Sequence, residues 1–267
     1  MLGCAIRGGN IKNIRRNTLR YSALHGINKL EIKISDSAEF QSLLEALASE
    51  LVEANIRFKL YADLTESISE YQEEYNQSTA FWSLTFQSHL DAAVFRLCKI
   101  YDQHAKTLNL RNLLDTTKAN IYVFDTEDFR ERLKDNPFVE SLSADSHRPD
   151  EEQLEGDLVY VSEGNPLVKN LTIWRNNFFA HRSAINAITK RNLADDYPLT
   201  VENVKELLVE GMKLINRYSN LFRATTYSTN MIGRNDFQFV LKSIREYLAM
   251  EERRIDEERK RWERGAS

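Results

Sequence analysis

Apolar residues recur along most of this chain at the three- and four-residue spacing that is typical of amphipathic helices. The first clear stripe begins at residue 37 and contains Phe40, Leu43, Leu44, Leu47 and Leu51. These positions share one face of an α-helix. A second helix is expected to run through residues 60–75. The pattern therefore predicts helical structure from residue 37 onward.

The strongest helical pattern is TAFWSLTFQSHLDAAVFRLCKIYDQH, residues 79–104. It has a broad apolar face and contains no proline or glycine, so we expect it to be the central helix of a bundle. Further helices are predicted after Asp125, over 166–188 with Pro166 in the first turn, from Thr200 as the N-cap, and over 235–264. The last one ends in the mixed-charge run EERRIDEERKRWER, which is typical of a solvated helix end with ion pairs between residues four apart.

Two regions depart from this spacing. Residues 1–35 are basic and contain four glycines, and residues 28–35 alternate weakly, which favours a short strand. Residues 134–165 combine prolines, glycines and acids, and they predict a long loop or an insertion with a short strand at 159–161.

These patterns predict an all-α fold, a helical bundle in three parts. The parts are a basic N-terminal extension over residues 1–35, a helical domain over 36–230 that carries the loop insertion 134–165, and a charged C-terminal helix over 231–267. The basic extension could be a solvated tail or an arm that attracts phosphate.

The composition is that of a folded protein, with 42% hydrophobic and 28% charged residues. A net charge of -4 argues against a protein that coats nucleic acid non-specifically. No apolar run approaches the ~18 residues of a membrane helix, and the first residues lack the apolar core of a signal peptide. Cys4 and Cys98 make no disulfide framework. We therefore expect no membrane association and a cytoplasmic location.

Several residues have ordinary structural interpretations. Cys98 lies in the predicted central helix and is expected to be a small buried hydrophobe. His89 lies in the same helix and is expected to be a hydrogen-bonded core residue. His104 and His147 stand in polar surroundings and are expected to be exposed.

Candidate chemistry is concentrated in LTIWRNNFFAHR, residues 171–182. Arg175 and His181 lie six residues apart beside three aromatic residues, so in a straight helix they are about 120° apart in azimuth and border an apolar stripe. Arg182 lies near the Arg175 border. The stripe could be buried within its own domain, or it could meet the same helix of a second subunit and bring two arginines and two histidines together.

The second arrangement suits RNA cleavage. A histidine with its usual pKa near 6.5 can take the proton from a ribose 2′-hydroxyl. An arginine presents a planar fork of donors to the phosphate and its developing negative charge. Asn176 or Asn177 could orient either group. This chemistry needs no metal or cofactor, and the sequence offers no obvious metal-ligand cluster.

The motif also carries a family resemblance. RNNFFAH resembles the R-x4-6-H signature of the HEPN superfamily, including the usual polar residue after the arginine. With the upstream FWSLTFQSHLDAAVFRLCKIYD, it looks most like the abortive-infection, AbiU-type branch. The resemblance covers about residues 37–222. It implies an all-α bundle that dimerises through the motif helices and acts as a metal-independent endoribonuclease in phage defence or toxin–antitoxin growth control.

Carried onto this chain, the resemblance implies that Arg175 binds phosphate, that Asn176 supports it, and that His181 acts as general acid or base. Asp102, which closes RLCKIYD, could face the same site or be a solvated carboxylate at a helix end. Asn177 and Arg182 are further supporting candidates. The implied partners are an RNA substrate, a second copy of the chain, and an antitoxin or regulatory protein.

Two further residue patterns limit what the resemblance implies. HEPN toxins that are silenced by tyrosine nucleotidylation carry a tyrosine two residues after the histidine, where this chain has Ser183, so that route of inhibition is not expected. A second Arg–His pair, Arg20 and His25, lies in the basic extension, and we interpret its R-x4-H spacing as a chance occurrence.

A different class of protein also fits the sequence. The chain could be a non-catalytic helical module for dimerisation or for nucleotide or partner binding. In an enzyme, His181 should be reachable by solvent in a cleft beside Arg175. In an interaction module, both side chains should be buried in satisfied hydrogen bonds.

Overall fold

The computed structural model describes residues 32–145, 147–179, 188 and 192–265. Within these residues the chain forms helices and no strand, which confirms the predicted all-α class. The elements are α2 (Ser37–Glu66), η1 (Ser67–Ser69), α3 (Gln72–Asn76), α4 (Thr79–Ile100), α5 (Leu110–Ala119), η2 (Ile121–Phe124), α6 (Thr126–Arg132), α7 (Val139–Leu142), α8 (Glu151–Tyr160), α9 (Pro166–Trp174), η3 (Arg175–Phe179), α11 (Leu193–Asp196), α12 (Val201–Arg223) and α13 (Asp236–Gly265). None of the described helices is long and apolar enough to cross a membrane.

The short strand predicted over 28–35 is not found in its described part, because residues 32–35 form no strand. Residues 28–31 lie outside the described residues.

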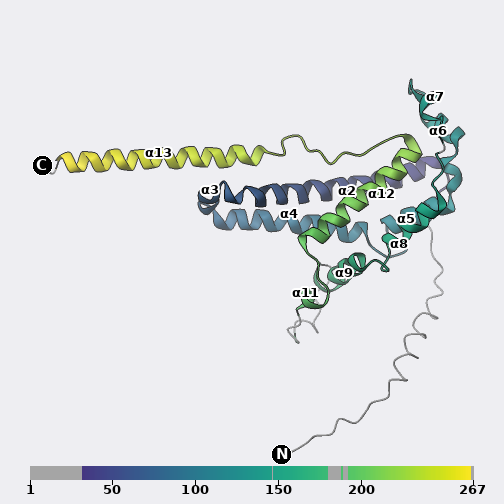
Figure 1. Cartoon of the computed structure of the whole chain (residues 1–267), viewed down its shortest axis with the longest axis horizontal. Coiled ribbons are helices and arrows are strands. Elements are labelled where there is room, and N and C mark those ends of the chain that lie inside the picture. Colours follow the sequence, from purple (N-terminus) through teal and green to yellow (C-terminus); the bar gives the residue numbers. More distant parts are fainter. Residues whose placement is uncertain (1–31, 146, 180–187, 189–191, 266–267) are drawn as a thin grey trace, which may run out of the picture.

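α2 and α4 lie side by side as the long central pair of the fold (Figure 1). α2 begins after the N-cap Asp36, whose side chain accepts a hydrogen bond from the Glu39 N–H at 2.9 Å. It continues to Glu66, so the helix predicted over 60–75 is in fact the end of α2 followed by the short helices η1 and α3. No proline or glycine interrupts these thirty residues, which explains why the helix does not break.

α12 packs across both central helices (Figure 1). Its predicted N-cap, Thr200, forms a capping box with Asn203. A Cβ atom at Gly211 would lie 3.2 Å from the Leu51 side chain and 3.4 Å from the Tyr101 hydroxyl, so the glycine permits a close crossing of the helices. The Tyr101 hydroxyl donates a buried hydrogen bond to the Leu207 carbonyl at 2.8 Å. This contact fixes the end of α4 against α12.

The segment predicted as a loop over 134–165 contains helices α7 and α8, and residues 159–161, where the pattern favours a strand, form the end of α8 and its C-cap. The structural reason is burial: Asp157 of α8 is 5% exposed and accepts hydrogen bonds from Gln153 Nε2 at 2.9 Å and from the Tyr218 hydroxyl at 2.8 Å. It also pairs with Arg217 of α12. The two bonds to α12 are long-range, and they stabilise a helix that local spacing did not indicate.

Two histidines differ from their predicted surroundings. His147 is buried rather than exposed: the residue is 8% exposed, its ring stacks on Phe129 of α6 at 3.5 Å between centroids, and its Nε2 bonds the Leu142 carbonyl at 2.9 Å. His89 is half-buried, and its Nδ1 has no hydrogen-bond partner among the described residues. Both expectations were based on neighbours in the chain, whereas burial depends on neighbours in space.

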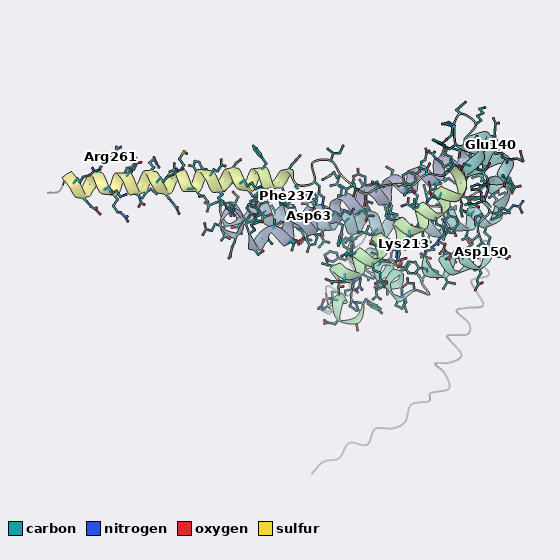
Figure 2. All side chains as sticks on the ribbon, turned by 45° about the horizontal axis from the view of Figure 1, so that its top comes forward. Asp63, Glu140, Asp150, Lys213, Phe237 and Arg261 are labelled. Carbon is teal, nitrogen blue, oxygen red and sulfur yellow. The ribbon has the colours of Figure 1, made fainter. Side chains whose placement is uncertain are left out.

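α13 extends away from the rest of the molecule and meets it only near its beginning (Figure 1). Leu241 is fully buried in a cluster with Leu64, Tyr71, Tyr75 and Trp82. Arg245 pairs with the buried Glu74 and stacks on Tyr71. Beyond Leu248, every described residue except Glu251 is exposed, and the side chains project into solvent around the helix (Figure 2).

The buried carboxylate of Asp157 gives a stability prediction. Replacing it with alanine leaves the Tyr218 hydroxyl and part of the Arg217 guanidinium without partners, and we expect a loss of about 2–3 kcal/mol in the free energy of unfolding. Urea denaturation followed by circular dichroism measures it. Asp135→Ala, at an exposed position after α6, is the control and should change stability by less than ~0.5 kcal/mol. Equal unfolding midpoints for the two variants would contradict the role given to Asp157.

The thiol of Cys98 gives a chemical prediction. It is 4% exposed, in agreement with the expectation of a buried hydrophobe. Burial raises its pKa to about 12, although the nearby Arg175 opposes the shift. In a Cys4→Ser variant at pH 8, iodoacetamide should therefore label Cys98 slowly in the native protein and rapidly in urea, where its pKa returns to about 8.5. Similar labelling rates in both conditions would show that the thiol is accessible.

Candidate active site

The arginine–histidine motif begins at the end of α9. That helix starts as predicted, with Pro166 at its first position and the Asn165 side chain accepting the Leu167 N–H at 3.0 Å. At its other end, Trp174 Nε1 donates to the Tyr197 carbonyl at 2.7 Å. The motif is thereby tied to the segment that leads into α12.

The helix predicted over 166–188 does not stay a regular α-helix. At Arg175–Phe179 it becomes η3, a π-helical turn. Such a turn holds more residues than an α-helical one, so azimuths that assume a straight α-helix no longer apply after Trp174. π-Helical turns occur frequently at functional sites. The turn therefore gives the side chains of the motif directions that the sequence pattern did not predict.

Arg175 forms an ion pair with Asp102. Its Nη1 donates to Asp102 Oδ1, and its Nε donates to Asn176 Oδ1 at 3.0 Å. Nη2 has no hydrogen-bond partner among the described residues. The Arg175 side chain is 26% exposed and that of Asp102 is 14% exposed. Of the two interpretations of Asp102, the structure therefore favours a place beside Arg175 over that of a solvated carboxylate.

Asp102 is itself held by the loop between α4 and α5. Its Oδ1 accepts the His104 N–H at 3.2 Å, and its Oδ2 accepts the Thr107 hydroxyl at 3.0 Å. Burial alone would raise the pKa of Asp102, but the hydrogen bond and positive charge of Arg175, with these two donors, outweigh burial and lower the pKa. Asp102 is therefore held as a carboxylate.

Sequence reasoning missed Thr107, because nothing in its local pattern indicates a carboxylate partner five residues earlier. Asn112 braces the same loop by donating to the carbonyls of Thr107 at 2.7 Å and His104 at 2.9 Å. The His104 side chain is exposed, as expected, and its Nδ1 accepts the Lys106 N–H at 3.3 Å.

The two asparagines of the motif differ in their contacts. Asn176 is exposed and binds Arg175, whereas Asn177 donates to the Ile173 carbonyl at 2.8 Å within its own helix. Asn176 is thus the motif amide that contacts the guanidinium. His181 and Arg182 lie outside the described residues, as does Ser183, and the geometry of the Arg175–His181 pair stays a prediction.

Three aromatic residues flank the arginine in the sequence and form a cluster of their own. Trp174, Phe178 and Phe179 contact one another at centroid distances of 5.2–6.4 Å. Phe179 and Trp174 line a small apolar hollow of about 120 Å³ against α4 and the start of α12, while Phe178 is 62% exposed. The motif therefore presents an aromatic surface that is partly open to solvent.

The described residues contain no group of three or more His, Cys, Asp or Glu placed to hold a metal ion. What the arrangement offers chemically is a guanidinium that is fixed at one end by a carboxylate and has donors remaining at the other. Such a group can bind a phosphate or another planar anion.

Comparison with known proteins agrees with the resemblance found in the motif. The model of the AbiU2 family of HEPN domains matches residues 37–247. No curated protein and no solved structure matches the chain. The family match covers most of the chain, including the central helices, the motif and the first part of α13. The chain therefore belongs to the AbiU2 family of HEPN domains, in the abortive-infection branch of the HEPN superfamily.

Proposed function

We propose that this chain is a metal-independent endoribonuclease that cleaves RNA by attack of a ribose 2′-hydroxyl and acts in phage defence or toxin–antitoxin growth control. Family membership supports an abortive-infection role and a HEPN-type activity. The observation that carries the proposal on this chain is Arg175, which Asp102 holds at a π-helical turn with its Nη2 without a partner among the described residues.

In the proposed reaction, Arg175 binds the scissile phosphate and stabilises the negative charge that grows on its oxygens. His181 removes the 2′-hydroxyl proton, so that the 2′-oxygen attacks phosphorus and the bond to the 5′-oxygen breaks. The leaving 5′-oxygen takes a proton from an imidazolium. The products carry a 2′,3′-cyclic phosphate and a 5′-hydroxyl.

The remaining candidates have supporting roles. Asn176 orients the guanidinium through the Nε hydrogen bond. Asp102 positions Arg175 and remains unprotonated because its pKa is lowered. Arg182 adds positive charge near the phosphate, and Asn177 helps to hold the turn.

We further propose that the motif helices of two copies meet, so that each copy contributes a histidine, and that an antitoxin or regulatory protein controls the assembly.

The competing hypothesis is a non-catalytic dimerisation or partner-binding module. In that case the Arg175–Asp102 pair would serve only to hold the π-helical turn in place. The two hypotheses differ in whether the pair contributes to a reaction rate, and this can be measured.

The first test is RNA cleavage in EDTA by the full chain. We expect cleavage with 2′,3′-cyclic phosphate ends, and a loss of about 10²–10⁴-fold in rate for His181→Ala, the range for a general acid or base. Arg175→Ala should lose about 10²–10³-fold, as when one stabilising donor is removed. Mass spectrometry of the fragments identifies the ends.

The chain offers a matched control for this test. His25→Ala removes the histidine of the other Arg–His pair and should leave the rate unchanged. No cleavage of varied RNAs by the wild type, with or without candidate activating ligands, would favour the interaction module. Cleavage that His25→Ala and His181→Ala reduce equally would move the activity away from this motif.

A second prediction concerns Asp102. Asp102→Asn keeps the size of the side chain but removes the charge that fixes Arg175, so the guanidinium should lose its orientation. We expect a decrease in kcat of about tenfold to a hundredfold, since a misplacement of about 1 Å can cost that much. Asp128→Asn on α6 is the control with the same change in charge. An unaltered rate in a folded Asp102→Asn protein would assign the pair to structure alone.

A further inference from the structure

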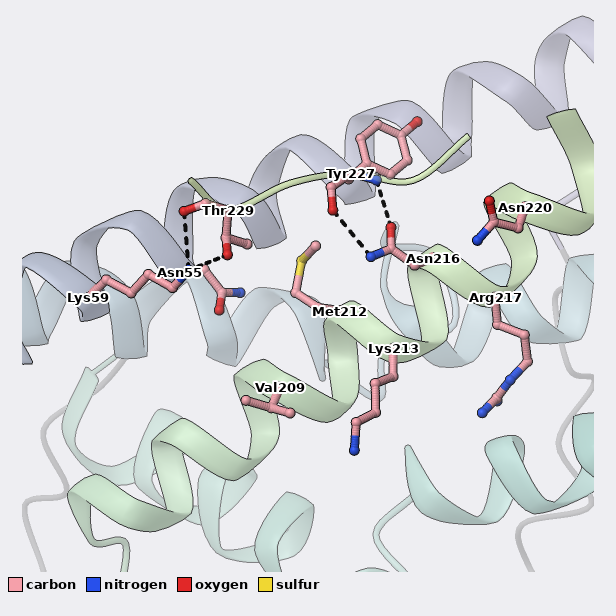
Figure 3. A pocket seen from close by; sticks show the side chains of 10 residues that line it. All are labelled: Asn55, Lys59, Val209, Met212, Lys213, Asn216, Arg217, Asn220, Tyr227 and Thr229. Atoms are coloured by element: carbon pink, nitrogen blue, oxygen red, sulfur yellow. Dashed lines mark hydrogen bonds between the residues drawn. The ribbon is translucent and has the colours of Figure 1, made fainter. Parts of the chain in front are cut away.

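A groove of about 550 Å³ opens between α2, α12 and the segment that follows α12 (Figure 3). Asn216 holds that segment in place, because its side chain accepts the Tyr227 N–H at 2.8 Å and donates to the Tyr227 carbonyl at 3.2 Å. The groove is lined by none of the residues assigned to the reaction. It is therefore a surface feature that the proposed activity leaves unexplained.

The lining of the groove is cationic, although the protein as a whole is acidic. Lys59, Lys213 and Arg217 line it, and no aspartate or glutamate does. Lys59 reaches from α2 to Thr229, while Lys213 and Arg217 extend from the same side of α12 (Figure 3). In this view the Lys213 and Arg217 head groups point away from Lys59 and Thr229, so the positive charges are spread over two sides of α12 rather than gathered at one point.

These cations keep their capacity for an anion. Lys59 Nζ donates only to neutral oxygens, the carbonyl and hydroxyl of Thr229, and no carboxylate of the described residues pairs with it. Lys213 pairs with Glu210 at 2.6 Å in an exposed contact, which is a weak bond in water. Arg217 uses Nη1 for Asp157 and has further donors available.

Amide groups also line the groove. Asn55 is 6% exposed, and its Nδ2 donates to the Leu51 carbonyl at 2.9 Å, so its oxygen is available to accept a bond. Asn220 accepts the Thr226 hydroxyl at 3.1 Å, and its Nδ2 has no partner among the described residues. The groove therefore offers a free acceptor and a free donor beside its positive charges.

We propose that this groove binds the phosphate backbone of a single RNA strand at a distance from the cleavage site. The proposal rests on the proposed function in taking RNA as the ligand. Successive phosphates of one strand that crosses α12 can each meet one of the separated lysines, and side-chain amides can bind base edges. A protein partner fits less well, because the centres of protein interfaces are rich in aromatic residues and poor in lysine.

The test measures binding separately from cleavage. A fluorescein-labelled U12 RNA is titrated with the full chain carrying His181→Ala, and fluorescence anisotropy is recorded at several salt concentrations. In this background, Lys59→Gln with Lys213→Gln is compared with Lys205→Gln with Lys242→Gln. The control pair makes the same change in charge at exposed positions outside the groove.

We expect the groove variant to bind U12 at least tenfold more weakly than the control variant. Its slope of log K against log salt should be shallower by about 1.4, or ~0.7 for each phosphate of a single strand that a lysine no longer neutralises. Thermal melting shows whether both variants are folded. If the double variant is unfolded, Lys59→Gln and Lys213→Gln are each compared with the single control variants in the same assay.

Other outcomes would overturn the proposal. Equal binding by the groove and control variants would place RNA elsewhere, and no binding by the parent would exclude the groove as an RNA site. Displacement of U12 by sub-millimolar ATP would indicate a mononucleotide site, and displacement by polyglutamate a site for an acidic protein. Because the assay uses a His181→Ala chain, an absence of cleavage in the wild type leaves its result interpretable.

Discussion

Burial of the apolar face of α2 against α4 and α12 is the constraint on which the remainder of the structure depends. Leu44 and Leu51 of α2 have no exposed surface, and Gly211 allows α12 to approach closely at the same place. Close-packed helices have few alternative arrangements. This contact therefore fixes the positions in space of the end of α4 and the start of α12. The candidate site is built from those two ends.

The end of α4 supplies Asp102, and the segment before α12 supplies the Tyr197 carbonyl that holds Trp174. Arg175 is thereby held between two parts of the chain that the helical core has already placed. A long and flexible side chain loses considerable conformational entropy when it is fixed. Here the Asp102 carboxylate already fixes the Arg175 side chain, so a bound phosphate would not have to order it. In an enzyme such an arrangement favours the rate of reaction over simple affinity.

α12 runs from the motif to the groove lined by Lys59, Lys213 and Arg217. Its first residues face the aromatic cluster of the motif, and its middle carries Lys213 and Arg217 along the groove. The net charge of -4 therefore says little about where an anion can bind, since a local field depends on the arrangement of nearby charges. An RNA strand held on both regions would span one rigid helix. α13, in contrast, is attached only near its beginning.

The sequence by itself determined the helical class, the helix starts at Pro166 and after Thr200, and the motif that contains Arg175, because these depend on spacing between near neighbours. It also marked Asp102 as a candidate without deciding where it points. Only the tertiary structure brought Asp102 to Arg175, 73 residues apart, added Thr107, and folded α8 around the buried Asp157. The π-helical turn likewise escaped prediction. Local periodicity reports which face of a helix is apolar, whereas contacts between distant residues depend on how those faces pack together.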